Sequence, residues 1–145
     1  RLHHPHAPSM IAFAAVPLPA PTAAGLAAYQ AQVLTPAGYA DRVSRGKDLF
    51  SKHNKKTDAV FKVVRHSLHA LGGVTRRCAY CEDSMADEVE HVAPKDLYPD
   101  QVFIWDNYVY ACGPCNGGHK KAHWKIFPAA GGGALDVTRK PKAPV

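Results

Sequence analysis

The residues best suited to chemistry lie in the second half of the chain, and four of them are its only cysteines. They fall as two Cys-x-x-Cys pairs, Cys78 with Cys81 and Cys112 with Cys115. Two such pairs supply the four thiolates of a tetrahedral structural zinc site. The alternative is a pair of disulfides in a secreted protein. Zinc is favoured because one set of residues at one spacing explains all four thiols.

The stretch between the two pairs is longer than in a simple two-knuckle zinc module. Thirty residues separate Cys81 from Cys112, whereas about 15–20 is usual. The insert contains the motifs EHVAPK and WDN and has room for a β-hairpin. We expect zinc to clamp the base of this hairpin to the following helix. Asn116, directly after the last cysteine, would then be held opposite the strand that carries His91.

Side chains in this region match the requirements of metal-dependent phosphodiester hydrolysis, which are a base and a divalent cation beside the phosphate. His91 is suited to be the base, and we expect its imidazole at the solvent-facing mouth of the site. Glu90 and Asn116 offer the oxygen ligands that Mg²⁺ or Mn²⁺ prefers. The glycines and basic residues of CGPCNGGHKK would let the backbone approach a phosphate and grip it.

The ordered set CxxC, EHxxPK, WDN and CxxCN resembles the HNH endonucleases, a family built on a ββα-metal fold, over about residues 76–124. The match is to an H-N-N variant, with the motif positions at His91, Asn107 and Asn116. The resemblance implies that His91 is the general base and that Asn107 orients the loop and the base. It also implies that Glu90 and Asn116 bind the catalytic metal, and that the cysteines hold the structural zinc found in many members.

A narrower similarity is to the HNH nuclease subunits of Septu-type and retron-linked anti-phage defence systems, which show the same order of motifs. Two features depart from the wider family pattern. Glu90 stands where many members have Asp, and neighbouring residues of a regular strand face opposite ways. Glu90 and His91 therefore serve one site only if the strand end twists or Glu90 acts indirectly. Asn116 replaces the metal-binding histidine of some members, which favours a hard cation.

The charge balance suits a nucleic-acid partner. Eighteen Lys and Arg residues against twelve Asp and Glu give a net charge of +6, and ten of the basic residues lie between Arg42 and Arg77. Such a balance favours polyanions. His119 is either a third metal ligand or a phosphate donor. The residues expected to contact nucleic acid are Lys95, Lys120 and Lys121.

The predicted fold class is α+β, with a helical N-terminal part packed on a zinc-stabilised ββα-metal module. Residues 1–9 resemble vector or linker sequence, 10–73 an extended segment and a basic helical region, 74–127 the HNH module, and 128–145 a flexible tail. We expect helices over 21–34, 39–52, 57–73 and from 116 to 124 or 127. Val43 and Phe50 should face inward in the second helix. The third has an apolar stripe with Thr57 as its N-cap.

The sequence therefore favours a metal-dependent nuclease that acts on DNA, although the same residues would suit RNA. One alternative is a non-catalytic zinc module that binds nucleic acid. Another is a subunit whose helices dock an ATPase or other defence-system partner. No stretch approaches the roughly 18 apolar residues of a membrane span, and the zinc-type cysteines favour a cytoplasmic protein.

Overall fold

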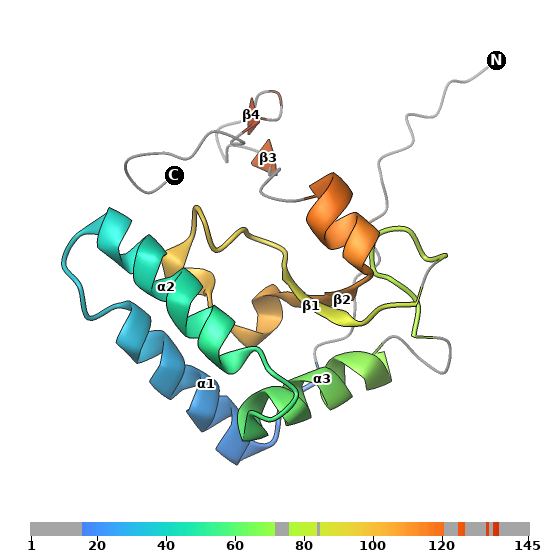
Figure 1. Cartoon of the computed structure of the whole chain (residues 1–145), viewed down its shortest axis with the longest axis horizontal. Helices are drawn as coiled ribbons and strands as arrows, with labels where there is room; N and C mark the ends of the chain where they lie inside the picture. Colours follow the sequence, from blue (N-terminus) through green and yellow to red (C-terminus); the bar gives the residue numbers. More distant parts are fainter. Residues whose placement is uncertain are drawn as a thin grey trace.

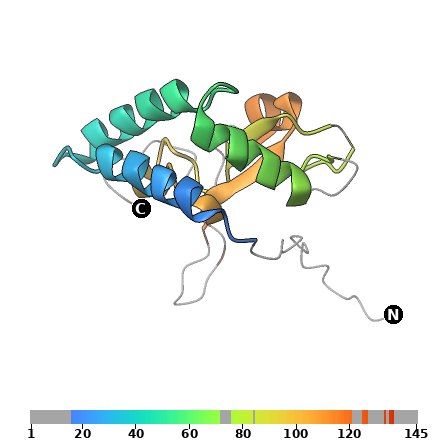
Figure 2. The same cartoon turned by 90° about the horizontal axis from the view of Figure 1, so that it is seen from below.

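The computed structural model describes residues 16–71, 76–83, 85–120, 125–126, 133 and 135–136, and these form an α+β fold. Three α-helices come first, followed by a small antiparallel sheet and a short π-helix. Figures 1 and 2 show the β1–β2 hairpin lying between α3 and the π-helix η3. The predicted fold class is confirmed. Within the described residues, no helix combines the length and apolar content that a membrane span needs.

The three helices are α1 (Ala20–Val33), α2 (Tyr39–His53) and α3 (Ala59–Leu71), close to the predicted ranges. Pro21 lies in the first turn of α1, where its missing N–H group is tolerated. The predicted N-cap of α3 is wrong by one residue. Asp58 Oδ1, and not Thr57, accepts the backbone N–H groups of Val60 and Phe61, each at 3.0 Å. Since the helix begins at Ala59, Asp58 is the residue placed to cap it.

A single apolar core joins the helices to the sheet. Phe50 of α2 and Phe61 of α3 are buried there, as their spacing predicted. Val43 is only half-buried, which corrects the expectation that it faces inward. Gly46 and Leu49 fill the inner face of α2 instead. Gly46 is required by a close approach, because an added Cβ would lie 2.9 Å from Val102. The other buried members of this core are Leu26, Val33, Val64, Leu68, Val89, Val102, Phe103 and Tyr108.

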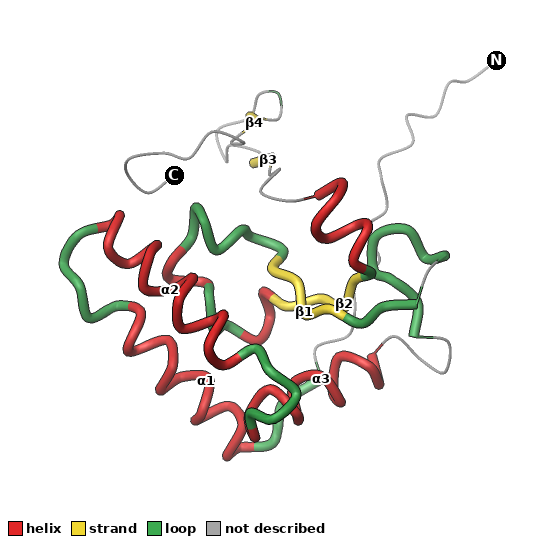
Figure 3. The backbone as a smooth tube through the Cα atoms, viewed as in Figure 1, coloured by secondary structure: helices red, strands yellow, loops and turns green. Residues whose placement is uncertain are grey.

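Two predicted strand regions form the hairpin. Strand β1 (Glu88–His91) pairs antiparallel with β2 (Tyr108–Ala111), so that Glu88 lies opposite Ala111 and His91 opposite Tyr108. The 3-10 helices η1 (Pro99–Gln101) and η2 (Trp105–Asn107) occupy the connection between the strands. Figure 3 shows how much of this connection is loop.

The region after the second cysteine pair differs from its prediction. A π-helix, η3 (Pro114–Lys120), begins two residues before the expected helix start. Beyond it, β3 (Lys125–Ile126) pairs with β4 (Leu135–Asp136). Strand β4 lies within 128–145, the range that the sequence predicted to be a flexible tail. Lys121, the vector-like residues 1–9 and most of the expected extended segment lie outside the described residues.

Candidate functional site

The four cysteines meet at the end of the β1–β2 hairpin. Their sulfur atoms lie within 4.8 Å of one another, and the Cys81 and Cys112 sulfurs are 3.9 Å apart. A zinc ion with Zn–S bonds of about 2.3 Å in a tetrahedron separates its sulfurs by about 3.8 Å. The cluster thus fits a zinc ion. Hydrogen bonding with Cys112 raises the pKa of the Cys115 thiol to about 12, so a bound cation is the natural way to hold these sulfurs as thiolates.

Backbone contacts prepare this cluster and connect it to the rest of the site. The Tyr80 N–H donates to the Cys78 sulfur at 3.4 Å, and the Ala79 N–H donates to the Tyr110 carbonyl at 3.0 Å. The Asn116 N–H donates to the Cys112 carbonyl at 3.0 Å. The position of Asn116 is therefore set by the second cysteine pair, as the sequence suggested.

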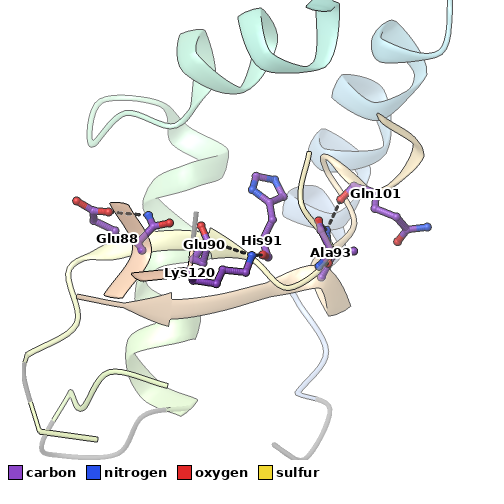
Figure 4. Close-up of polar contacts among 8 residues, drawn as sticks. Glu88, Glu90, His91, Ala93, Gln101 and Lys120 are labelled. Atoms are coloured by element: carbon purple, nitrogen blue, oxygen red, sulfur yellow. Dashed lines mark hydrogen bonds and ion pairs between the residues drawn. The ribbon is translucent and has the colours of Figure 1, made fainter. Parts of the chain in front are cut away.

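Strand β1 divides its side chains between two environments because successive residues alternate. Val89 and His91 pack against the apolar core, while Glu88 and Glu90 contact η3. Asn116 Nδ2 donates to Glu88 Oε2 at 2.6 Å. Figure 4 shows Glu88 and Glu90 on β1, with Lys120 in contact with Glu90. The sequence analysis did not single out Glu88, although its two-residue spacing from Glu90 places both on one face.

Glu90 is buried and already has a cationic partner. Only 5% of its surface is exposed, and its Oε1 accepts a hydrogen bond from Lys120 Nζ at 2.5 Å. The same ammonium group donates to the His91 carbonyl oxygen. Lys120 therefore forms an ion pair with Glu90, the carboxylate that the sequence predicted as a metal ligand, rather than extending toward a phosphate.

His91 is buried rather than at the mouth of the site, which corrects our expectation. Only 2% of the residue is exposed. Its ring lies 4.4 Å from the Phe50 ring and 5.3 Å from the Tyr108 ring, both in edge-to-face geometry. Figure 4 shows the imidazole extending from β1 toward the helices. The strand turns this side chain inward because the core packs on that face.

The protonation of His91 follows from its surroundings. Its Nε2 lies 2.9 Å from the Val102 carbonyl oxygen, which only accepts hydrogen bonds, so Nε2 carries the proton. Burial lowers the pKa of His91 to about 3, and the Lys95 and Lys120 ammonium groups act in the same direction. The neutral ring therefore keeps an unprotonated Nδ1, which is buried and has no hydrogen-bond partner in the described part of the chain. Such an unsatisfied buried atom calls for an explanation.

Asn107 holds the loop that follows His91. Its Oδ1 accepts the Ala93 N–H at 2.7 Å, and its Nδ2 donates to the carbonyls of Ala93 and Gln101 at 3.0 and 2.8 Å. The Asn107 carbonyl also accepts the Val92 N–H at 2.9 Å. One buried amide thus fixes both sides of the loop between the strands. Figure 4 shows Ala93 and Gln101, whose backbone groups this amide contacts.

An open pocket of about 400 Å³ runs along β1, between the helices and η3. One wall carries Glu88, Glu90 and Asn116, with Asp87 beside them. Lys56 and Arg65, which come from the helical region, also line the pocket. The remaining lining residues are Phe50, Asn54, Val89 and Lys95. This volume is within the range of sites that bind small ligands, about 300–1,000 Å³.

The structure brings together only part of the predicted site. Glu90 and Asn116 line one pocket, and Lys95 joins them with its Nζ 5.5 Å from the centre of the Phe50 ring. His91 lies behind this pocket in the core, and His119 is exposed on η3. Glu88 is a lining residue that sequence reasoning missed, and Lys56 and Arg65 were recognised only as members of the basic Arg42–Arg77 segment. No local motif marks them, since the fold alone places them there.

Comparison with known proteins gives one partial match. A stretch of 46 residues is 46% identical to the Septu protein PtuB of Bacillus thuringiensis. The match covers 28% of this chain and only 18% of that protein. No protein-family model and no solved structure matches the chain. The chain is therefore a partial relative of a Septu protein. It also carries a cysteine cluster that fits a zinc ion.

Proposed function

We propose that this chain is a metal-dependent nuclease of the HNH type that hydrolyses phosphodiester bonds of DNA. The observation that carries the proposal is that Glu88, Glu90 and Asn116 line one pocket, while the same strand β1 holds the buried neutral His91 on its core-facing side. Carboxylates and an amide oxygen are hard ligands suited to Mg²⁺ or Mn²⁺. When bound there, such a cation would stabilise the negative charge that develops on the reacting phosphate.

The residues of the chain have separate tasks in this proposal. His91 holds an unprotonated Nδ1, with the ring fixed by the Nε2–Val102 bond, and is the base that takes a proton from the attacking water. Its low pKa weakens it as a base, so substrate or cation binding must open a path to Nδ1. Asn107 positions the ring through the loop after β1. Asn116 would present its oxygen to the cation, because its Nδ2 donates to Glu88.

Lys120 must move for this site to work. Its ammonium group neutralises Glu90, so a divalent cation competes with it for the same oxygen. Once displaced from Glu90, Lys120 is close enough to the pocket to contact a phosphate. His119 is exposed on the same helix and is a further phosphate donor or metal ligand in the proposal.

The likeness to a Septu protein supports a defence role. We infer that the nuclease acts in antiviral defence, in the cytoplasm, with a second protein such as an ATPase as partner. The match spans a small share of the PtuB chain, so this part of the proposal rests on the shared stretch and on the order of the motifs.

Plasmid cleavage by the zinc-loaded chain tests the activity. We expect nicking or cutting with Mg²⁺ or Mn²⁺ and none without them. His91→Gln should lower the rate by a factor of about 10²–10⁴, the usual contribution of a general base. Glutamine is chosen because it is similar in size to the buried ring. His66→Gln is the matched control, since His66 is exposed on α3 and should leave the rate unchanged.

The cation ligands are tested in the same assay. Glu88→Gln, Glu90→Gln and Asn116→Ala should each slow cleavage, and added Mn²⁺ should restore part of it. Asp106→Asn, at an exposed carboxylate outside the pocket, is the control. Full activity in His91→Gln, or equal losses in the ligand variants and the control, would refute the assignment.

The buried state of His91 and the Lys120–Glu90 pair also favour a second function, a zinc module that binds nucleic acid or a partner without catalysis. That candidate predicts binding without cleavage at any metal concentration. The plasmid assay therefore separates the two functions directly.

A further inference from the structure

We propose that Arg65 and Lys56 form a phosphate-binding subsite where the helical region lines the pocket that also contains the carboxylates. The ligand is a backbone phosphate of the DNA strand, next to the one that would be cleaved. This inference rests on the proposed function, because it places a neighbouring phosphate of the same substrate. It assigns part of substrate binding to the helical region, outside the residues that carry the family resemblance.

The position of the two residues is the first argument. Arg65 lies on α3 and Lys56 in the turn between α2 and α3, far in sequence from β1. Both nonetheless line the 400 Å³ pocket together with Glu88, Glu90 and Asn116. A nucleic-acid strand that places one phosphate at the carboxylate wall would pass the basic wall with another.

The second argument is that the Arg65 side chain is fixed before any ligand binds. Its Nη2 donates to the Asn54 backbone carbonyl at 3.2 Å and also to the Asn54 side-chain oxygen. Its Nε is buried and has no hydrogen-bond partner among the residues that the structure describes. A guanidinium held this way loses little rotamer entropy on binding, and its donors match the geometry of a phosphate.

The positive charges of the basic residues that line the pocket also favour this subsite. Within residues 16–71, 76–83 and 85–120, the ion pairs are Lys47–Asp96, His53–Asp58 and Lys120–Glu90. Arg65, Lys56 and Lys95 thus face the pocket without a carboxylate partner in the described part of the chain. A divalent cation at the acidic wall would offset Asp87, Glu88 and Glu90. The basic wall would then attract polyanions more strongly.

Arg65 also has a structural role, which the experiment must distinguish from phosphate binding. Asn54 is the C-cap residue of α2, so its bond to Arg65 also secures the end of that helix. Lys56 is exposed, and no hydrogen bond or ion pair joins it to another described residue. Lys56→Ala therefore removes a pocket charge without disturbing the helix end. Arg65→Lys keeps the charge but loses the fork of donors.

The experiment measures binding of a short DNA duplex to the zinc-loaded full chain by fluorescence anisotropy, at several salt concentrations and without added Mg²⁺ or Mn²⁺. Each duplex phosphate neutralised contributes about 0.9 to the slope of log affinity against log salt. We expect Lys56→Ala to reduce the slope by about that amount at unchanged melting temperature, and Arg65→Lys to weaken binding severalfold. Lys62→Ala is the matched control, an exposed residue of α3 that does not line the pocket.

Two outcomes would overturn the inference. One is that the slopes for Lys56→Ala and Lys62→Ala are equal while Arg65→Lys binds like the wild type. The other is that the wild-type chain binds no DNA. Failure of the proposed function gives a different result, in which Lys56 and Arg65 contribute to binding but the plasmid is never cut. Because binding is measured without the catalytic cation, the two failures are distinguishable.

Discussion

The helical half of the molecule and its cysteine cluster are stabilised in different ways. The helices bury a continuous set of large apolar side chains, among them Phe61, Val64 and Val33, each 0% exposed. Around the cysteines, the buried cluster of described residues consists of Cys78, Ala111 and Cys112, with Cys115 packed against it. One region folds on hydrophobic burial, whereas the other offers four sulfurs that are placed for a cross-link through a metal.

The candidate site lies where these two regions meet. Phe50 and Arg65 belong to the helical half, Glu88 and Glu90 to β1, and Asn116 follows the last cysteine. The helical core fixes His91, whereas the cysteine cluster fixes Asn116. A change in either region should therefore affect a different part of the site.

The largest expected effect is the loss of a cysteine. Cys112→Ser should abolish zinc binding, because structural zinc contributes on the order of 10 kcal/mol of apparent binding free energy in small domains. Asn116 should lose its position, while much of the helical circular dichroism remains. Zinc content and thermal melting are the measurements. A metal-free variant that melts like the wild type would disprove the zinc assignment.

The matching change in the helical half removes an aromatic side chain. Phe61→Ala should lower the free energy of unfolding by about 3–5 kcal/mol, since a fully buried phenyl group leaves a cavity. Phe61 packs edge-to-face on Phe50 at 5.6 Å between ring centres. Chemical denaturation measures the loss, with Lys62→Ala as the exposed neighbour on the same helix. Equal stability of the two variants would contradict a core centred on Phe61.

His91 should make stability depend on pH. Its pKa is about 3 in the folded chain and about 6.5 when unfolded. Below pH 6.5 the unfolded state therefore binds a proton that the folded state does not, so stability falls as the pH decreases from 6.5 toward 3. His91→Gln should flatten this dependence. Thermal melting between pH 7.5 and 5.5 measures it, and His66→Gln should retain the wild-type slope.

Periodicity and cysteine spacing were enough to predict the three α-helices, the strands β1 and β2 and the cysteine cluster. Phe61, Val64 and Leu68 lie on one face of α3 at helical spacing. Four cysteines in two close pairs are typical of a metal site. These features depend on local order in the sequence, which is why they could be read from it.

Other parts of the site depend on which face of β1 meets the helices, and the sequence does not contain that information locally. His91 is buried because that face packs against Phe50, and Glu88 joins Asn116 because the other face meets η3. Lys120 reaches Glu90, and Arg65 reaches the pocket, only through the tertiary fold. Contacts of this kind are set by packing between distant segments.

The most direct test of the central claim is a Mn²⁺ titration of the zinc-loaded chain, followed by electron paramagnetic resonance of the free ion. We expect one Mn²⁺ site that is lost or strongly weakened in Glu88→Gln and Glu90→Gln and unchanged in Asp106→Asn. Lys120→Met should bind Mn²⁺ more tightly than the wild type, because its ammonium group no longer competes for Glu90. No Mn²⁺ binding in either the wild type or Lys120→Met would contradict a catalytic cation in this pocket.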